Sequence, residues 1–304
     1  MQTTNVTARW PRGILLVVNP AARRARAGER RAVETLEALG IAVTRAASRR
    51  AGDVTSLVRE RATDVDAVFT LGGDGTAMEA ITALAGAGPP IGVLPGGTAN
   101  VLARTLGVPL RLDRAVHALV AGREARLDLG RLSDGRLFAI GLGIGLDATM
   151  IGEASATLKR RLGVGAYVVS ALRAGLRFER FTARVTVDGR PHAHDASAIL
   201  LANFGVVANG WFTFGDDIAH DDGLLNACIF SPRSRLDALR IAWRMLRRGP
   251  SGDRALTYLA GRHFRIETSP VRAAQADGEI VGTTPLEVEV LAGAGRVLVG
   301  RGAV

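Results

Sequence analysis

Cysteine, lysine and aromatic residues are scarce in this sequence. Cys228 is the single cysteine among 304 residues, so no disulfide can form within the chain, and the apolar run around it predicts a buried structural thiol. Lys159 is the single lysine and no G-K-[ST] sequence is present, which excludes a Walker A loop. Aromatic residues make up only 5% of the chain, too few for an extended base-stacking surface, so no nucleic-acid partner is expected.

Long apolar runs and metal-binding patterns are also missing. No apolar stretch reaches the roughly 18 residues that span a bilayer, and residues 1–12 lack the hydrophobic centre of a signal peptide. We therefore expect a soluble, cytoplasmic chain. His192 and His194 have no cysteine nearby, so a polar surface turn is a better interpretation than a metal site. No G-x-S-x-G sequence is present, so a nucleophile elbow is not predicted.

Acidic residues are outnumbered, and the formal net charge is +10. This excess favours an anionic partner such as a nucleotide phosphate or an acidic membrane surface, but charge alone does not choose between them. The length suggests two domains, each large enough for its own hydrophobic core.

Two loops rich in glycine and threonine are the strongest signal in the chain. Gly72-Gly73-Asp74-Gly75-Thr76 directly follows the apolar run Ala67 to Leu71, and Pro95-Gly96-Gly97-Thr98-Ala99-Asn100 follows the run Ile91 to Leu94. Glycines let backbone amides approach anionic oxygens, and a threonine hydroxyl can donate to a phosphate. One such loop could be an ordinary turn, but two close together predict a nucleotide-phosphate site and ATP as the nucleotide.

The first half of the chain alternates short apolar runs with helical patterns. Strands are predicted at residues 13–18, 41–44, 67–71 and 91–94. One helix is predicted between the first two strands and ends at Gly40, and two more are predicted at 53–62 and 77–85. This alternation predicts an α/β domain with a parallel sheet over residues 12–128. Both glycine loops and Asn19 then lie at the carboxyl ends of strands, where open sheets bind ligands.

The second half is rich in predicted strands and forms a second domain over residues 129–295. The strand patterns lie at 136–142, 181–187, 196–204, 224–230, 264–268, 286–291 and 297–300, with helices within 156–176 and at 236–247. They favour a β-rich domain that is sandwich-like or barrel-like. We expect the nucleotide in the interdomain cleft.

Two acidic turns in this half could carry chemistry. Asp221-Asp222-Gly223 precedes a strand, and Asp277-Gly278-Glu279 lies between two strands. Each could place carboxylates in a cleft. The alternative for either turn is structural, because Asp-Gly is a common hairpin turn.

The series of motifs resembles the diacylglycerol kinase catalytic family, which includes sphingosine kinases and bacterial lipid kinases. The motifs are Gly72 to Thr76, Gly97 to Asn100, Gly143-Ile-Gly-Leu-Asp147, Leu162-Gly-Val-Gly-Ala-Tyr167, Asp222-Gly-Leu224 and Asp277-Gly-Glu279. The first motif alone is shared with NAD kinases and the phosphofructokinase superfamily. The resemblance extends from about Ile14 to Arg301, and it suggests that the final strand, at about 296–302, returns to the first domain.

The resemblance implies roles for particular residues. Asn19, Gly72 to Thr76, Gly97, Thr98 and Asn100 would bind ATP, and Asp277 would take a proton from the lipid hydroxyl with Glu279 beside it. Asp222 would bind Mg²⁺ through its side chain, together with backbone oxygens of Leu224 and Ala219. These roles agree with the general needs of phosphoryl transfer and with the oxygen ligands that Mg²⁺ prefers.

The sequence departs from the family pattern at three places. Asn19-Pro20 is followed by Ala21-Ala22-Arg23 and not by a small hydroxyl residue and glycine, Val101 stands where many relatives have aspartate, and the usual threonine is not evident near Ser48. The first phosphate contact and part of a magnesium network are therefore in doubt, although the glycine loops and the Asp277/Glu279 pair remain.

Residues 236–248 have the composition of an interfacial helix, and we expect the protein to act at the inner membrane surface. The pattern combines an apolar stripe of Leu236, Leu239, Trp243 and Leu246 with Arg240, Arg244, Arg247 and Arg248. Its alternative is an ordinary amphipathic helix that covers the core of the second domain.

The sequence thus predicts an ATP- and Mg²⁺-dependent kinase that phosphorylates the hydroxyl of a diacylglycerol-like lipid. Alternatives are an NAD kinase-like phosphotransferase and a non-catalytic lipid- or nucleotide-binding regulator. The identity of the lipid is open, as are a homodimer and control by anionic phospholipid.

Overall fold

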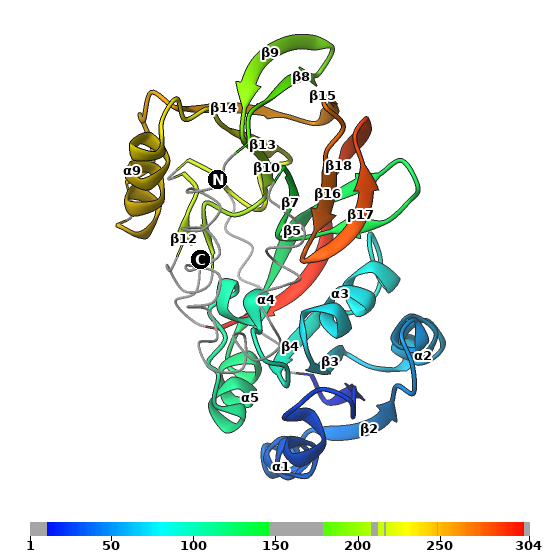
Figure 1. The fold of residues 1–304 in the computed structure, drawn as a ribbon. Helices are drawn as coiled ribbons and strands as arrows, with labels where there is room; N and C mark the ends of the chain where they lie inside the picture. The colour runs from blue at the N-terminus through cyan, green and yellow to red at the C-terminus, as the bar shows by residue number, and fades with distance from the viewer. Residues whose placement is uncertain (1–10, 146–178, 208–211, 216, 248, 301–304) are drawn as a thin grey trace, which may run out of the picture. The chain divides into compact units, whose positions relative to one another are not determined.

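The computed structural model describes residues 11–145, 179–207, 212–215, 217–247 and 249–300 (Figure 1). The chain divides into two compact units. The first comprises residues 1–125 and 296–304, and the second comprises residues 126–295. The chain passes from one unit to the other within strand β5 (Arg123–Leu132) and again within strand β18 (Leu286–Val299).

The first unit contains a parallel sheet in the order β2-β1-β3-β4. Its strands are β1 (Gly13–Val18), β2 (Ala42–Ala47), β3 (Ala67–Gly72) and β4 (Ile91–Pro95), and the end of β18 adds beside β4 through Val297 and Ile91. Strands β3 and β4 are buried along their whole length. Their continuous apolar runs are explained by burial on both faces of the sheet, and the predicted parallel sheet is confirmed.

The helices of the first unit connect these strands. They are α1 (Ala25–Ala38), α2 (Asp53–Arg61) with a 3₁₀ turn η1 (Ala62–Asp64), α3 (Asp74–Ala83), α4 (Val101–Thr105) and α5 (Leu112–Val120). From β1 the chain moves outward to β2, then returns past β1 to β3 and β4. Right-handed crossovers in opposite directions place α1 on one face and α2 and α3 on the other. The strand order therefore reverses between β1 and β3, which is where open sheets bind ligands.

The second unit contains two antiparallel sheets. One has the order β18-β15-β8-β9, with β5 beside β18 and β6 (Leu137–Phe138) beside β5; the other has the order β14-β13-β10-β7-β16-β17. Their strands are β7 (Gly141–Ile144), β8 (Phe181–Val187), β9 (Arg190–Ala196), β10 (Ala198–Ala202), β13 (Leu225–Phe230), β14 (Leu256–Gly261), β15 (His263–Ser269), β16 (Ala273–Ala276) and β17 (Glu279–Thr283). A short pair, β11 (Val206–Val207) and β12 (Phe212–Thr213), and helix α9 (Arg235–Leu246) complete the unit.

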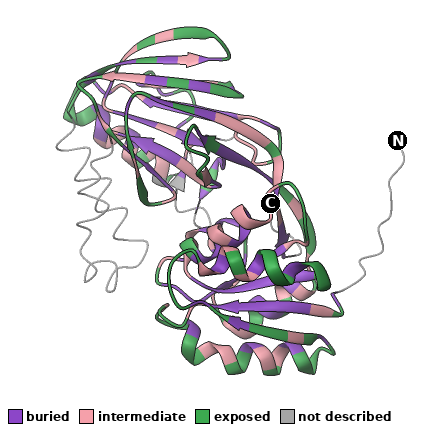
Figure 2. Cartoon of the chain, turned by 90° about the vertical axis from the view of Figure 1, so that its right-hand side faces the viewer, coloured by how far each residue is buried: buried purple, intermediate pink, exposed green. Residues whose placement is uncertain are grey.

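The hydrophobic core of the second unit lies between these two sheets. Alternate residues of β8 are buried, and they share one cluster with residues of the other sheet such as Leu142, Ile199 and Ala227. The buried faces are purple in Figure 2. This is the arrangement of a β-sandwich, so the predicted β-rich, sandwich-like domain is confirmed.

Several predictions about single elements are wrong or incomplete. His192 and His194 belong to strand β9 and not to a turn, because an edge strand with polar side chains lacks the apolar pattern of a buried one. The patterns at 286–291 and 297–300 are one strand, β18, whose glycine-rich middle was interpreted as a turn. The sequence patterns do not predict helices α4 and α5 or strands β5, β11, β12, β14, β16 and β17. The predicted helix within 156–176 lies outside the described residues.

Other predictions agree with the structure. Cys228 is buried in β13 as expected, and the helix predicted at 236–247 is α9. Within the described ranges, every helix is too short or too polar to span a bilayer.

Candidate active site

Asn19 joins the carboxyl ends of strands β1 and β3 in the parallel sheet. Its backbone amide donates to the carbonyl oxygen of Leu71 (3.0 Å), and its side-chain amide donates to the hydroxyl oxygen of Thr76 (3.1 Å). Its side-chain oxygen accepts from the amide of Ala21 (3.0 Å), which closes the turn after β1. Asn19 therefore bridges the point where the strand order reverses, although the residues after Pro20 depart from the family pattern.

The two glycine loops contact each other backbone to backbone. The amide of Gly96 donates to the carbonyl of Gly72 (2.8 Å). A Cβ atom on Gly97 would lie 2.6 Å from the Cα of Gly73, and one on Gly72 would lie 2.4 Å from the hydroxyl oxygen of Thr76. Real Cβ atoms do not approach other atoms so closely, so these positions require glycine. The loops therefore form one structural unit.

Two polar side chains hold the shape of this unit. Asn100 adopts a left-handed conformation (φ 47°), and its side chain bonds both the amide and the carbonyl of Gly97. A carboxylate oxygen of Asp74 accepts from the amide of Leu102 (2.8 Å), at the start of α4. Burial raises the pKa of Asp74, and the hydrogen bonds from Leu102 and Val101 oppose that shift. Asp74 thus connects the first loop to the second, although Val101 itself is not acidic.

The remaining polar groups of the first loop suit an anion. By helix geometry, the first amides of α3 have no carbonyl acceptor within the helix, and they carry the positive end of its dipole. The Thr76 hydroxyl accepts from Asn19, so its own hydrogen is directed elsewhere. Gly75 and Thr98 are exposed. This arrangement can bind phosphate oxygens.

Asp277 occupies a tight turn in the second unit. Asp277 and Gly278 connect β16 to β17, and both have positive φ (47° and 93°), as a type I′ turn requires. The Asp277 carboxylate accepts three backbone hydrogen bonds: from Ala139 (2.8 Å) and Ile140 (2.9 Å), which link β6 to β7, and from Gly141 (3.0 Å), the first residue of β7. These contacts fix the orientation of the carboxylate. Glu279 is exposed at the start of β17.

A second turn of the same kind shows what such an aspartate does structurally. Asp188 and Gly189 connect β8 to β9 with φ values of 47° and 82°. The Asp188 carboxylate accepts from the amides of Arg262 (3.0 Å) and His263 (2.9 Å). Asp188 therefore offers a matched comparison for Asp277.

The loop expected to hold Mg²⁺ precedes β13. Asp222 is exposed, and one of its carboxylate oxygens accepts from the amide of Leu224 (2.9 Å). Gly223 between them has a φ of 77°. Among the described residues, no three His, Cys, Asp or Glu side chains lie together, so a metal held by this loop would need backbone oxygens, such as those of Ala219 and Leu224. One carboxylate and backbone carbonyls are hard oxygen donors that fit Mg²⁺.

A buried carboxylate that sequence reasoning missed supports this loop. Asp128 is fully buried in β5, and its two oxygens accept from the amides of Gly223 (2.6 Å) and Gly293 (2.7 Å). The Asp128 amide donates to the carbonyl of His220 (2.7 Å). In the sequence, this role is indicated by a single acidic residue that stands between Leu127 and Leu129.

Asn203 extends this network toward Asp277. Its side-chain amide donates to the carbonyls of Asp128 and Ala139, both at 2.7 Å, and the amide of Ala139 donates to Asp277. Asn203 is fully buried after β10. The 219–224 loop and the Asp277 turn are therefore connected through one chain of hydrogen bonds inside the second unit.

These features define the class of protein: a parallel-sheet unit with two glycine loops that can bind phosphate, followed by a β-sandwich unit. The model of the diacylglycerol kinase catalytic domain matches residues 13–132, and the model of the YegS C-terminal NAD kinase beta sandwich-like domain matches residues 141–299. The chain belongs to the diacylglycerol kinase family, whose members are kinases with an alcohol group as acceptor. Membership of this family implies the use of ATP.

Individual proteins are similar to this chain over most of its length. An uncharacterised protein of Synechocystis sp. is 31% identical over 228 residues, which are 74% of this chain and 52% of that protein. A Staphylococcus epidermidis protein named as a candidate lipid kinase is 28% identical over 236 residues, 75% of each chain. The crystal structure of a candidate diacylglycerol kinase from Bacillus anthracis has the same fold, with a TM-score of 0.84 at 24% identity over 100% of both chains.

Proposed function

We propose that the protein is an ATP- and Mg²⁺-dependent lipid kinase that phosphorylates the hydroxyl of a diacylglycerol-like lipid. The observation that carries this proposal is the pair of glycine loops, held in backbone contact at the carboxyl ends of the neighbouring strands β3 and β4. A second observation supports it: the Asp277 carboxylate is fixed by three amides.

In this proposal the first loop and the start of α3 bind the triphosphate through backbone amides and the Thr76 hydroxyl. Thr98 lies at the exposed tip of the second loop and adds a further hydroxyl. Asp74 and Asn100 contribute by holding the two loops in place, as their hydrogen bonds indicate. Because phosphoryl transfer depends mainly on positioning, a rigid cradle is the appropriate arrangement.

Asp277 orients the lipid hydroxyl and accepts its proton. Its three amide donors hold the carboxylate in one orientation. Phosphoryl transfer depends mainly on positioning, so orientation of the alcohol is the larger contribution. Glu279 lies two residues further on, at the start of β17, and adds negative charge beside the acceptor.

The loop at 219–224 would hold Mg²⁺ through Asp222 and the backbone oxygens of Ala219 and Leu224. When bound in a kinase, this ion neutralises charge on the phosphates. The side chains of Asp128 and Asn203 connect this loop by hydrogen bonds to the segment that holds Asp277. The acceptor is proposed as a diacylglycerol-like alcohol because the matched family model is that of the diacylglycerol kinase catalytic domain and the similar Bacillus anthracis structure carries that name.

Transfer of labelled phosphate from ATP tests the proposal. Purified protein is incubated with γ-labelled ATP, Mg²⁺, NAD and a mixed lipid extract, and the labelled products are identified by mass spectrometry. A labelled phospholipid that Asp277→Asn does not form is the expected result. Label in added NAD with none in lipid would replace the lipid kinase with an NAD kinase-like enzyme, and no label in either would favour a non-catalytic binding protein.

A further inference from the structure

Helix α9 exposes two large apolar side chains on one face. Leu236 is 76% exposed and Trp243 is 57% exposed, and they are two of the six large apolar side chains that are exposed among the described residues. They stand seven residues apart, which places them on one side of the helix, two turns from each other. The opposite side, with Ala238 and Ile241, is buried. α9 therefore covers the sandwich with one face and leaves an apolar stripe on the other.

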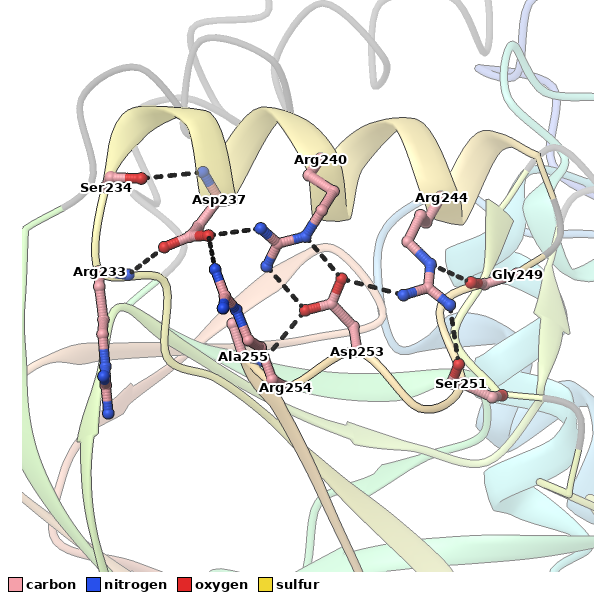
Figure 3. Close-up of polar contacts among 10 residues, drawn as sticks. All are labelled: Arg233, Ser234, Asp237, Arg240, Arg244, Gly249, Ser251, Asp253, Arg254 and Ala255. Atoms are coloured by element: carbon pink, nitrogen blue, oxygen red, sulfur yellow. Dashed lines mark hydrogen bonds and ion pairs between the residues drawn. The ribbon is translucent and has the colours of Figure 1, made fainter.

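The arginines of α9 divide into two groups. Arg240 and Arg244 both bond the buried carboxylate of Asp253 (2.9 and 3.2 Å between the nearest atoms), and Arg244 also bonds the carbonyls of Gly249 and Ser251. Figure 3 shows this network, which attaches α9 to the 249–255 loop. These two arginines have a structural role. This modifies the sequence-based hypothesis, which counted them as part of a membrane-facing charge.

Arg247 belongs to the second group. Its guanidinium lies 4.3 Å from the centre of the Trp243 ring, in a cation–π contact, and the residue is exposed. Arg233, Arg235 and Arg254 are exposed around the same helix. The apolar stripe is therefore bordered by positive charge.

The acidic residues of this region do not cancel that charge at the surface. Residues 231–255 contain seven arginines and two acidic residues, Asp237 and Asp253. Both acidic residues are buried and paired with arginine. The outer surface of α9 thus combines exposed leucine and tryptophan with positive charge, which is complementary to an anionic lipid surface.

We propose that α9 is the surface through which this protein docks on an anionic phospholipid bilayer. Leu236 and Trp243 enter the headgroup region, and Arg247 with its exposed neighbours contacts lipid phosphates. Tryptophan is suited to this position because its ring is apolar and its N–H reaches water or headgroups. The inference rests on the proposed function in one respect: a lipid kinase must meet its acceptor at a membrane.

Vesicle flotation without nucleotide tests the docking surface. Wild-type protein, Leu236→Ala, Trp243→Ala and the double variant are compared on vesicles of phosphatidylcholine alone and of phosphatidylcholine mixed with phosphatidylglycerol. We expect the wild type to prefer anionic vesicles and each single variant to bind them about tenfold more weakly. Arg247→Gln should weaken binding to the anionic vesicles about fivefold. Val271→Ala is the control, because Val271 is 61% exposed in the same unit but lies outside α9.

Each outcome separates docking from catalysis. Unchanged thermal unfolding of the variants shows that they fold, as expected for exposed side chains. The proposal is overturned if the double variant floats with anionic vesicles as well as the wild type does. It is also overturned if the variants lose self-association on gel filtration but keep vesicle binding. That second result would assign α9 to contact with a second copy of this chain. Selective loss of vesicle binding supports docking even if no lipid is phosphorylated, a result that would count only against the proposed function.

Discussion

Replacement of Asp277 by asparagine changes one atom of a side chain that three backbone amides hold. One carboxylate oxygen accepts from Ile140 and Gly141, and the other accepts from Ala139. The asparagine oxygen can keep the first two hydrogen bonds, while its NH₂ group meets the Ala139 amide as a second donor. One hydrogen bond to a charged acceptor is lost, and we expect the free energy of unfolding to fall by about 1.5 to 3 kcal/mol.

The effect on phosphate transfer should be much larger than the effect on stability. If Asp277 orients and deprotonates the acceptor, its loss lowers the rate by about 10² to 10⁴-fold in protein that remains folded. Asp188→Asn is the matched control. One oxygen of Asp188 accepts from both Arg262 and His263, so asparagine retains both bonds and the cost should stay below about 1 kcal/mol.

The two variants are compared by initial rates of label transfer from ATP to lipid and by urea unfolding. The account requires Asp277→Asn to lose transfer while Asp188→Asn retains it. Transfer by Asp277→Asn at a rate comparable to wild type would refute the role of Asp277. An equal loss in both variants would show that transfer falls because the second unit is disturbed, and not because the Asp277 carboxylate is lost.

Three further perturbations test other parts of the structure. Gly97→Ala places a Cβ atom 2.6 Å from the Cα of Gly73, so calorimetry should show weaker ATP binding and a free energy of unfolding lower by about 1 to 3 kcal/mol. Gly13→Ala is the control, because its Cβ atom would have nothing within 4 Å, and it should change neither quantity. Hydrogen bonds from Arg240 hold the pKa of Asp253 below its ordinary 3.8, so this pair stabilises the folded protein above about pH 4 and loses its effect as pH falls further. Asp253→Asn should therefore cost about 2 kcal/mol near neutrality and progressively less in acid, as followed by circular dichroism; a pH-independent difference would contradict the ion pair. Burial raises the pKa of the Cys228 thiol to about 12. The thiol of the folded protein should therefore resist alkylation at mildly alkaline pH and react once urea unfolds the protein. Rapid alkylation of the folded protein would be inconsistent with burial of this thiol.

The parallel-sheet half could be predicted from the sequence because its signals are local. Strands buried on both faces are continuous apolar runs, and the turns between strand and helix carry glycine. Strand β9 was missed because its polar side chains follow no apolar pattern, and β18 was divided because its central glycines are typical of turns. Strand β18 is held by pairing with β4 and β5, which are distant in sequence, and local patterns do not report such pairing. Strand β9 forms a hairpin with the neighbouring strand β8.

Polar contacts across long sequence separations were the least predictable part. Asp128 and Asn203 are separated by 75 residues, and nothing local indicates that their contact supports a loop at residues 219–224. The same limit applies to α9, where the sequence indicates an arginine-rich helix but not which arginines pair with Asp253. The acidic turn at Asp277 could be located from its Asp-Gly pattern, but the three amides that hold its carboxylate could not.

A crystal structure with a non-hydrolysable ATP analogue and Mg²⁺ tests the central claim most directly. We predict the phosphates on the Gly72–Thr76 loop and the start of α3, and the Asp277 carboxylate facing the terminal phosphorus. Glycine loops without bound nucleotide, or an Asp277 carboxylate remote from the terminal phosphorus, would contradict the account.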